Sequence, residues 1–371
     1  MSREQVLRRR LSVQRLTAPG VSTAVDVVRR LTCVQSQEYA HGFWSLGMRA
    51  AGLGYDDVQR EFDAGAFVRT HVLRPTWHFV AAEDLRWILR ATSPRVQQIN
   101  RSRYRQLGLD QSVLDRSADV LCSALRGIDL TRTQLGHALV ADGIDVAGQR
   151  LAYLVMNAEL EGLICSGPMR GAQHTYAVVA ERVSPTPEVS TEEGLAELAR
   201  RFFAGHGPAG VKDLSRWSSL TTASAHLGLE LARDRLEQVA VEGQALWWDP
   251  SFAEPEPSTG DTSTGETSPG DPPVALLLPL YDEATLSYPQ LNFPLAPGHP
   301  HPPGTDLFVG SVILDAVNVG TWRRTVRGRT VQVETRLAGG VSAAGRSAVA
   351  EAVAALASFL DKQLEAPGPA W

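Results

Sequence analysis

One stretch of the chain, residues 129–179, restricts the fold more than any other, because helices and strands follow one another there in a set order. Asp129 or Thr131 can cap a first helix, and an amphipathic second helix is predicted over 149–163. Directly behind it, two short β-type segments around a Gly-Pro-Met-Arg-Gly turn predict a hairpin with strands at 164–166 and 175–180. Helix, turn, helix and hairpin in this order form the winged-helix pattern.

The same order recurs on both sides of this stretch. Downstream, helices are predicted at 191–204, 211–217 and 221–236, followed by strands at 237–241 and 244–248. The N-terminal part fits less tightly, with helices expected at 4–14, 23–34 and 55–64 and strands at 68–73 and 76–80. We therefore expect three tandem winged helices, the first elaborated, in a fold that is mainly α with β. Such an array places several helices and wings along one face, which suits wrapping a duplex.

The last third of the chain has a different composition. Residues 251–273 are rich in Pro, Gly, Ser, Thr and acidic residues without apolar periodicity, which predicts a flexible acidic loop. Apolar β-type runs follow at 274–280, 307–314, 318–322 and 330–336, and a final helix is expected at 343–364. This part should therefore form a small β-barrel or sheet closed by a helix. The predicted division of the chain is 1–105, 106–183, 184–250, 251–273 and 274–371.

Charge is distributed unevenly along the chain. The net charge is −5, but residues 1–105 hold 17 arginines, no lysine and nine acidic residues, a balance of +8. The other 266 residues hold 19 basic and 32 acidic residues, a balance of −13. The first third is therefore a candidate surface for a polyanion. Of the 36 basic residues 34 are arginine, which suits phosphate binding and is equally explained by codon bias.

Composition also excludes several classes of protein. A chain of 371 residues is too long for one compact core and suits two or three domains. No stretch reaches 18 consecutive apolar residues, so we expect no membrane span. The Arg-rich start has no apolar core of about 7 to 15 residues behind it, so we expect no secretory signal and a cytoplasmic, nucleoid-associated protein. The three cysteines, Cys33, Cys122 and Cys165, are widely spaced, which excludes a disulfide framework and a cysteine-based zinc site.

The usual catalytic motifs of nucleotide hydrolysis, dinucleotide chemistry and zinc or serine hydrolysis are missing. What remains is the polar segment Gln35-Ser36-Gln37, placed after an apolar helix in the basic third. Two glutamines at a spacing of two are weak evidence by themselves. Exposed polar residues at the end of a helix are the alternative interpretation.

Several segments, taken in order, carry a resemblance to a known family. They are the Gln-x-Gln segment after a helix, the aromatic loop at 40–46, and the segments at 69–89, 213–221, 276–289 and 310–324. With these the chain resembles the winged-helix DNA glycosylases of the AlkZ/YcaQ type over nearly its whole length. The resemblance implies a C-shaped molecule of three winged helices and a C-terminal β-barrel. It also implies excision of N7-alkylated guanine from double-stranded DNA, in some members from interstrand cross-links, without a metal or other cofactor.

The family's two catalytic polar positions fall on Gln35 and Gln37. Where both are glutamine, the residue between them is usually aliphatic in the family, whereas here it is Ser36. The segment Tyr281-Asp282-Glu283 also departs from the usual Phe-Asp-Glu-Tyr run, a difference that bears on substrate range more than on reaction type.

Two amides make chemical sense in such a site. N7 alkylation places a positive charge on the purine, so the base leaves neutral and needs no general acid, unlike the leaving group of ordinary glycoside hydrolysis. The enzyme has only to place a water molecule and stabilise an oxocarbenium-like sugar, and a glutamine oxygen can do either. Its NH2 group can hold the water or a neighbouring phosphate. On the sequence alone, the roles of Gln35 and Gln37 are interchangeable.

A second group of candidates should contact the DNA: Arg69, His71, Arg74, His78, Arg170 and His174. Strand alternation is expected to put Arg69 and His71 on one face of the sheet and Trp77 and Phe79 on another. For Trp77 and Phe79 a core position is favoured, and for His78 a half-buried structural role. Arg170 and His174 bracket the predicted wing turn, where a phosphate or minor-groove contact competes with a solvated hairpin tip.

The acidic pair Asp282 and Glu283 could act as catalytic carboxylates, but its place after a strand favours turn or packing residues. The main alternative function is a non-catalytic winged-helix transcriptional regulator, since fold alone does not establish catalysis. Against it, the predicted helix 149–163 carries only Arg150 as a basic residue beside Glu159 and Glu161, a poor surface for phosphate. An inert scaffold would not need the basic first third. No heptad pattern is present, so we expect a monomer.

Overall fold

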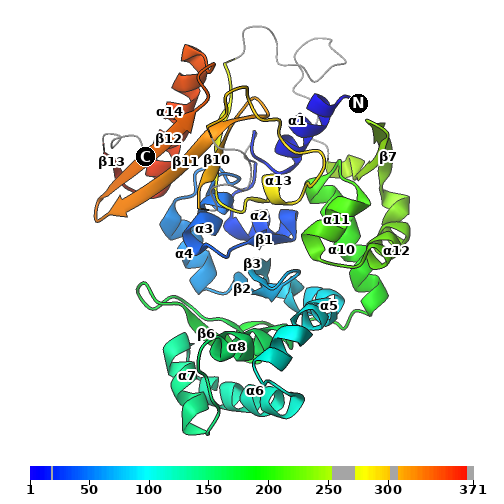
Figure 1. Cartoon of the computed structure of the whole chain (residues 1–371), viewed down its shortest axis with the longest axis vertical. Coiled ribbons are helices and arrows are strands. Elements are labelled where there is room, and N and C mark those ends of the chain that lie inside the picture. The colour runs from blue at the N-terminus through cyan, green and yellow to red at the C-terminus, as the bar shows by residue number, and fades with distance from the viewer. Residues whose placement is uncertain (18–19, 253–271, 301–307, 366–371) are drawn as a thin grey trace.

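The computed structural model describes residues 1–17, 20–252, 272–300 and 308–365. Figure 1 shows the N-terminal elements in the middle of the molecule, with three other groups of elements around them. The helices between residues 111 and 160 lie at one end, those between 191 and 232 lie on one side, and the C-terminal sheet with the helix at 343–359 lies on the other. Among the described residues no helix is long and apolar enough to cross a membrane.

The central group forms a three-stranded antiparallel sheet, in the order β1-β3-β2, surrounded by helices. Its elements are α1 (Arg3–Val13), α2 (Ala24–Leu31), β1 (Cys33–Gln35), α3 (Tyr39–Gly47), α4 (Tyr55–Asp63), β2 (Phe67–Val72), β3 (Thr76–Ala81) and α5 (Leu85–Gln106). The helix predicted to run to residue 34 ends at Leu31, because Thr32 adopts a φ of 67° that a helix does not allow. Gln35 therefore lies on a strand.

The second group repeats this order of elements. It contains α6 (Gln111–Leu125), β4 (Leu130–Thr131), α7 (Arg132–Ala141), α8 (Arg150–Leu160), β5 (Ile164–Ser166), β6 (Thr175–Val178) and α9 (Val179–Arg182). Thr131 caps α7 in a capping box with Gln134, as the sequence suggested. Its sheet has the order β4-β6-β5, so its strands are arranged as in the central group.

The third group has the same helices with a reduced sheet. Its elements are α10 (Thr191–His206), α11 (Val211–Ser218), α12 (Thr222–Ala232), β7 (Glu237–Val241) and β8 (Gln244–Trp248). The two strands pair with each other at their predicted bounds. In place of a first strand, Ala209 forms a single antiparallel bridge to Trp247.

The C-terminal part is a five-stranded sheet with the order β13-β12-β11-β10-β9, against which one long helix packs. Its elements are β9 (Ala275–Leu278), α13 (Glu283–Leu286), β10 (Gly310–Leu314), β11 (Val317–Arg327), β12 (Thr330–Leu337), α14 (Ala343–Phe359) and β13 (Gln363–Leu364). In the described ranges β9 and β13 do not pair, so the strands form an open sheet and not a closed barrel. The predicted acidic loop lies, from 253 to 271, outside the described residues.

The four groups of elements share apolar cores. One core joins α2, α3 and α4 to the C-terminal sheet, where Trp322 and Phe359 pack against Trp44 and its neighbours. Another joins β2, β3 and α5 to α10, α11 and α12. The second group has a core of its own, which includes Tyr104 of α5, and it adds Cys165 and Val179 to the core around α5. The central group therefore shares a core with each of the other three groups, and it carries the two glutamines.

Candidate active site

Gln35 is held by groups from both ends of the chain. On β1 it pairs with His78 of β3, so the two side chains share one face of the sheet. Its backbone N–H donates to the Glu283 carboxylate at 2.8 Å, and its side-chain oxygen accepts from the Arg74 guanidinium at 2.7 Å. A guanidinium can only donate, so this contact also fixes which end of the Gln35 amide faces Arg74. Gln35 is 8% exposed.

Arg74 connects Gln35 to two further groups. It donates to the backbone oxygen of Trp217 at 3.0 Å and to Nε2 of His78 at 3.1 Å. Nε2 must therefore accept, and Nδ1 donates to the Thr76 backbone oxygen at 2.9 Å. Burial, reinforced by the charge of Arg74, lowers the pKa of His78 to about 3. His78 is accordingly a neutral acceptor near neutral pH and not a general acid.

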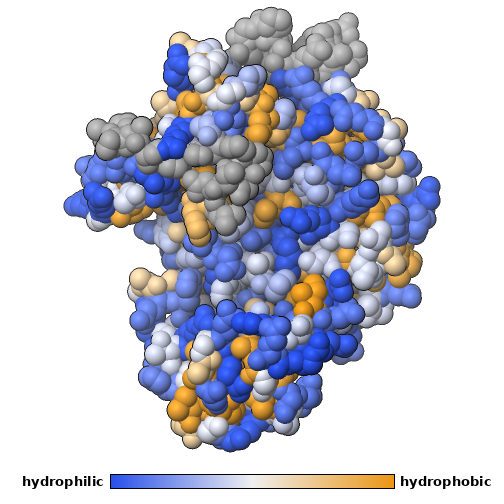
Figure 2. All heavy atoms as spheres, viewed as in Figure 1, coloured by the Kyte–Doolittle hydropathy of each residue, from blue (hydrophilic) through white to orange (hydrophobic). Residues whose placement is uncertain are grey.

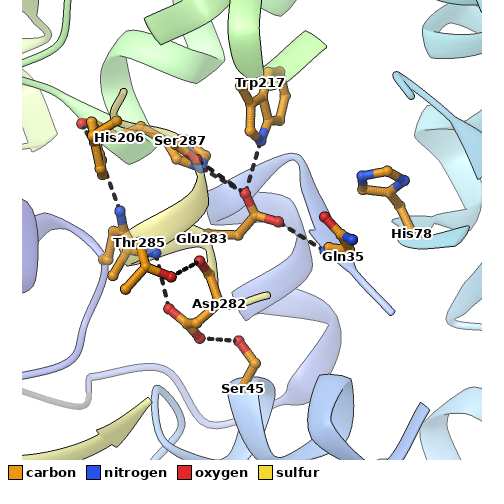
Figure 3. A network of polar contacts seen from close by, with 12 residues as sticks. Gln35, Ser45, His78, His206, Trp217, Asp282, Glu283, Thr285 and Ser287 are labelled. Carbon is orange, nitrogen blue, oxygen red and sulfur yellow. Dashed lines mark hydrogen bonds and ion pairs between the residues drawn. The ribbon is translucent and has the colours of Figure 1, made fainter. Parts of the chain in front are cut away.

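Glu283 lies behind Gln35 as a fully buried carboxylate (Figure 3). Besides the Gln35 N–H, it accepts from Trp217 Nε1 at 3.0 Å and Ser287 Oγ at 3.2 Å, and His206 Nε2 lies 3.8 Å away. Burial alone would raise the pKa of Glu283. The contact with His206 and the positive charge of Arg74 outweigh burial and lower this pKa to about 2. Glu283 is therefore a permanent negative charge at the back of the site.

Asp282, its neighbour, has a separate set of contacts. Both of its carboxylate oxygens accept from the Arg49 guanidinium, at 2.8 and 2.9 Å, and Ser45 donates to it at 2.7 Å. Asp282 also caps α13 through the backbone N–H of Ala284. Both acids are buried and hydrogen-bonded to protein groups, so the packing role favoured from the sequence agrees with their contacts.

Gln37 stands in a different environment from Gln35. Its half-buried side chain lines a cleft of about 690 Å³ between α3, α4 and the β5–β6 connection. Within the described residues its side-chain amide has no hydrogen-bond partner. The backbone around it is fixed by Arg69, which donates to the carbonyl oxygens of Ser36 at 3.0 Å and Gln37 at 3.3 Å. The Gln37 amide can therefore bind a ligand without first breaking a protein contact.

The prediction that Arg69 and His71 lie on the opposite face from Trp77 and Phe79 is wrong. In the antiparallel register Arg69 pairs with Phe79 and His71 with Trp77, so these residues share a face. The Arg69 guanidinium lies 4.3 Å from the centre of the Trp77 ring. Side chains alternate within each strand, but alternation does not define the register between two strands. That register decides which residues of β2 and β3 share a face.

This face is sealed by a residue of the second group. Glu159 of α8 accepts a hydrogen bond from Trp77 Nε1 at 3.3 Å, and its other oxygen contacts Nδ1 of His71. Both His71 and Glu159 are buried, at 3% and 0% exposure. Glu159 thus fixes Trp77, Trp77 supports Arg69, and Arg69 holds the backbone of Ser36 and Gln37.

The six predicted DNA contacts occupy different environments. Arg69, His71 and His78 are buried, at 8%, 3% and 0% exposure, and Arg74 is half-buried. A direct contact of either histidine with DNA would require this layer to open. Arg170 is exposed in the connection between β5 and β6, where it donates to the backbone oxygen of Asp129 at 2.6 Å. His174 lies in the cleft, edge-on to the ring of Tyr39.

Three residues of this site were not singled out from the sequence as site residues: Trp217, Glu159 and His206. Trp217 lies inside a segment that carries the family resemblance, and this was the available signal. Glu159 was considered only as an unfavourable charge on a DNA-binding helix, whereas it is buried against His71. In the described part of the chain, no group of three or more His, Cys, Asp or Glu side chains could hold a metal ion.

Comparison with known proteins shows the family of the chain. An interstrand DNA cross-link repair glycosylase of Streptomyces sahachiroi is 26% identical over 269 residues, 67% of this chain and 70% of that protein. The solved structure of the S. sahachiroi DNA glycosylase AlkZ superimposes with a TM-score of 0.75 at 20% identity, covering 98% of this chain and 100% of that one, which shows a shared fold. The model of the family described as DNA glycosylase AlkZ-like matches residues 28–359. The chain therefore belongs to the AlkZ-like DNA glycosylase family.

Proposed function

We propose that this protein hydrolyses the N-glycosidic bond of N7-alkylated guanine in double-stranded DNA. The substrates are bulky monoadducts, interstrand cross-links or both, and the role is base excision repair or self-resistance to a DNA-alkylating metabolite. The observation that carries the proposal is the pair of amides in one segment. Gln35 is locked by Arg74, and Gln37 opens with a free amide onto a cleft. The cross-link activity named for the S. sahachiroi relative supports the same substrate class.

The reaction needs little from acid–base groups. The oxygen of a water molecule bonds to C1′ while the bond from C1′ to N9 breaks, and the electron pair of that bond neutralises the cationic purine. The base leaves neutral, and the extra proton of the attacking water passes to solvent. Because the leaving group needs no proton, a site without a titrating acid near neutral pH is sufficient.

The two amides receive different roles on this geometry. The Gln37 oxygen is free to accept a hydrogen bond from the attacking water and to face the developing positive charge of the sugar. The oxygen of Gln35 is already bound to Arg74, which leaves its NH2 group to hold the water or a neighbouring phosphate. In this scheme Glu283 and Arg69 contact neither the sugar nor the attacking water. They act as positioning residues for the segment at 35–37.

The fold suits a protein that wraps a duplex. We assign the repeated order of helices and strands to three winged helices, in residues 1–105, 106–183 and 184–250, around a C-shaped channel. We assign direct phosphate contact to the exposed Arg170, and support of the DNA-binding surface from below to the buried Arg69, His71 and His78. We expect a monomer that acts in the cytoplasm on nucleoid DNA and binds less tightly as salt rises.

The direct test is incubation of the protein with a duplex that bears one N7-alkylguanine. The proposal expects free modified base and an abasic site that alkali converts to a strand break. An undamaged duplex of the same sequence is the control. Tight binding to one undamaged sequence without release of base would overturn the proposal and favour the transcriptional regulator.

A further inference from the structure

The cleft beside Gln37 has two walls that come from different groups of elements. Residues of α3 and α4 form one wall, and the connection between β5 and β6 forms the other. Figure 2 shows the surface hollowed at this edge of the molecule, above the β5–β6 connection. The connection is fastened to α4, because the backbone N–H of Met169 donates to the Asp63 carboxylate at 2.7 Å. The cleft is therefore a defined space, and Gln37 stands at its side.

Aromatic side chains line both walls. The rings of Tyr39 and His174 meet edge to face, with centroids 4.6 Å apart and planes at 78°. Tyr39 is held in place by Phe43, at 4.4 Å between centroids, and by a hydrogen bond from its hydroxyl to Gln59. Burial raises the pKa of Tyr39 and lowers the pKa of His174 to about 4, so both rings are neutral near pH 7. Such rings favour planar and cationic ligands.

The charges of the cleft favour a cation as well. Glu38 and Asp63 both line it, and Arg69 is the single arginine or lysine among its described lining residues. The Arg69 guanidinium is already bound to two carbonyl oxygens and stacked on Trp77. Two carboxylates against one engaged guanidinium make a poor groove for phosphate. They suit a positively charged group.

We infer that this cleft receives the substituent carried on N7 of the base, and that it selects bulky, planar, cationic substituents. The inference rests on the proposed function and names the part of the substrate that each wall contacts. Because the two ring planes lie at 78°, the planar part stacks on the ring of His174 and meets that of Tyr39 edge-on. Glu38 and Asp63 attract its positive charge. Gln37, at the side of the cleft, then lies between the substituent and the sugar.

The test uses three duplexes of one sequence, each with a different lesion. The first bears N7-methylguanine, the second an N7 adduct with an aromatic ring and an amine, and the third the same adduct with a neutral group replacing the amine. The measured quantities are ratios of kcat/KM between lesions. For His174→Ala, the ratio of either bulky lesion to N7-methylguanine should fall about ten-fold. For Glu38→Gln, the ratio of cationic to neutral adduct should fall, and the neutral adduct should keep its ratio to N7-methylguanine.

Two further variants separate stacking from loss of structure. His174→Phe keeps a ring and should restore most of the ratio lost in His174→Ala. Gln173→Ala changes an exposed neighbour outside the cleft and should keep the ratios of the parent protein. Ratios that stay at the parent values in both His174→Ala and Glu38→Gln would overturn the inference. A parent protein that releases no base from any of the three duplexes would instead overturn the proposed function, and this inference with it.

Discussion

Gln35 and Gln37 lie two residues apart in one segment, yet they stand in opposite environments. Gln35 is 8% exposed, and both its backbone N–H and its side-chain oxygen are bound. Gln37 is half-buried at the edge of a cleft, with a side-chain amide that has no partner in the described residues. Arg74 and Glu283 bind Gln35 directly, and Trp217 contacts both of them, so three groups of elements meet at this residue.

The difference shows how a site built on two uncharged amides can be both rigid and adaptable. The locked amide sets the position of the segment before any substrate arrives, which is the preorganisation that lowers a reaction barrier. In the proposed function, the free amide is left to bind substrate and water. Two residues of one type therefore depend on different parts of the molecule, and variants should separate them.

The largest effect is expected for Gln35→Ala, which removes the acceptor of a half-buried guanidinium as well as a reacting-site amide. Base release should slow on the order of 10² to 10³-fold. The free energy of unfolding should fall by about 1 to 3 kcal/mol because Arg74 loses a partner. Single-turnover release and urea unfolding measure the two effects. An unchanged unfolding free energy would show that the contact with Arg74 is dispensable.

A smaller effect is expected for Glu283→Gln, which keeps the shape but removes the charge behind Gln35. The amide oxygen can still accept from the Gln35 N–H, but the NH2 group then faces the donating Trp217 Nε1–H, and the attraction to Arg74 is lost. The value of kcat should therefore fall by about ten-fold with KM nearly unchanged. Glu283→Ala should lose more, and Ser287→Ala, which removes the longest of the three hydrogen bonds to Glu283, should lose less. Equal losses in kcat and in stability across the three variants would reduce Glu283 to a packing residue.

The pH dependence should be flat for the rate and steep for stability. His78 and His41 have pKa values of about 3 and about 4, and Glu283 about 2, so none of them changes charge between about pH 6 and 8. Below about pH 6.5 the unfolded chain binds protons on these histidines that the folded chain does not. Stability is therefore lost as pH falls, by about 1.4 kcal/mol per pH unit for each histidine. Glu283 adds to the loss only below about pH 4.5.

These pH dependences are measured by base release between about pH 6 and 8 and by urea unfolding at about pH 7 and 5. His78→Gln should weaken the acid dependence of unfolding, because it removes one of the histidines. A bell-shaped rate profile with limbs near neutrality would transfer the catalytic role from the amides to a histidine.

The smallest effect is expected for Ser36→Ala, at the position between the two glutamines. The Ser36 hydroxyl is fully buried and has no hydrogen-bond partner in the described residues. Its removal should stabilise the fold by up to about 1 kcal/mol and change the rate by less than about two-fold. Destabilisation in urea unfolding would indicate that the hydroxyl has a partner in solution.

Local patterns predicted much of the secondary structure. The strands at Glu237–Val241 and Gln244–Trp248 have their predicted bounds, because a Glu-Gly turn separates two β-type runs. The end of α2 was missed, since the apolar run continues through Val34 and nothing local reveals the positive φ of Thr32. The family resemblance, and not periodicity, drew attention to Gln35 and Gln37.

The residues that hold the site in place could not be predicted from local sequence patterns. Glu283 reaches Gln35 across 248 residues of chain, and neither hydrophobic period nor spacing encodes such a pairing. The same holds for Glu159 and His71, which belong to different groups of elements. Arg69 and Trp77 share a face of the sheet because of the register between β2 and β3. The turn between these strands, where Leu73 has a φ of 61°, sets that register.

The most direct test of the account is the Gln37→Ala variant, measured for single-turnover base release and for DNA affinity on one N7-alkylguanine duplex. The free amide contributes to the reaction barrier and not to the fold or to phosphate binding. The rate constant should therefore fall on the order of 10² to 10³-fold, with the dissociation constant and the unfolding free energy within about two-fold and about 0.5 kcal/mol of the parent. Base release at the parent rate would contradict the assignment of this site, and a rate loss matched by an equal loss of DNA affinity would show that Gln37 binds substrate without acting on the barrier.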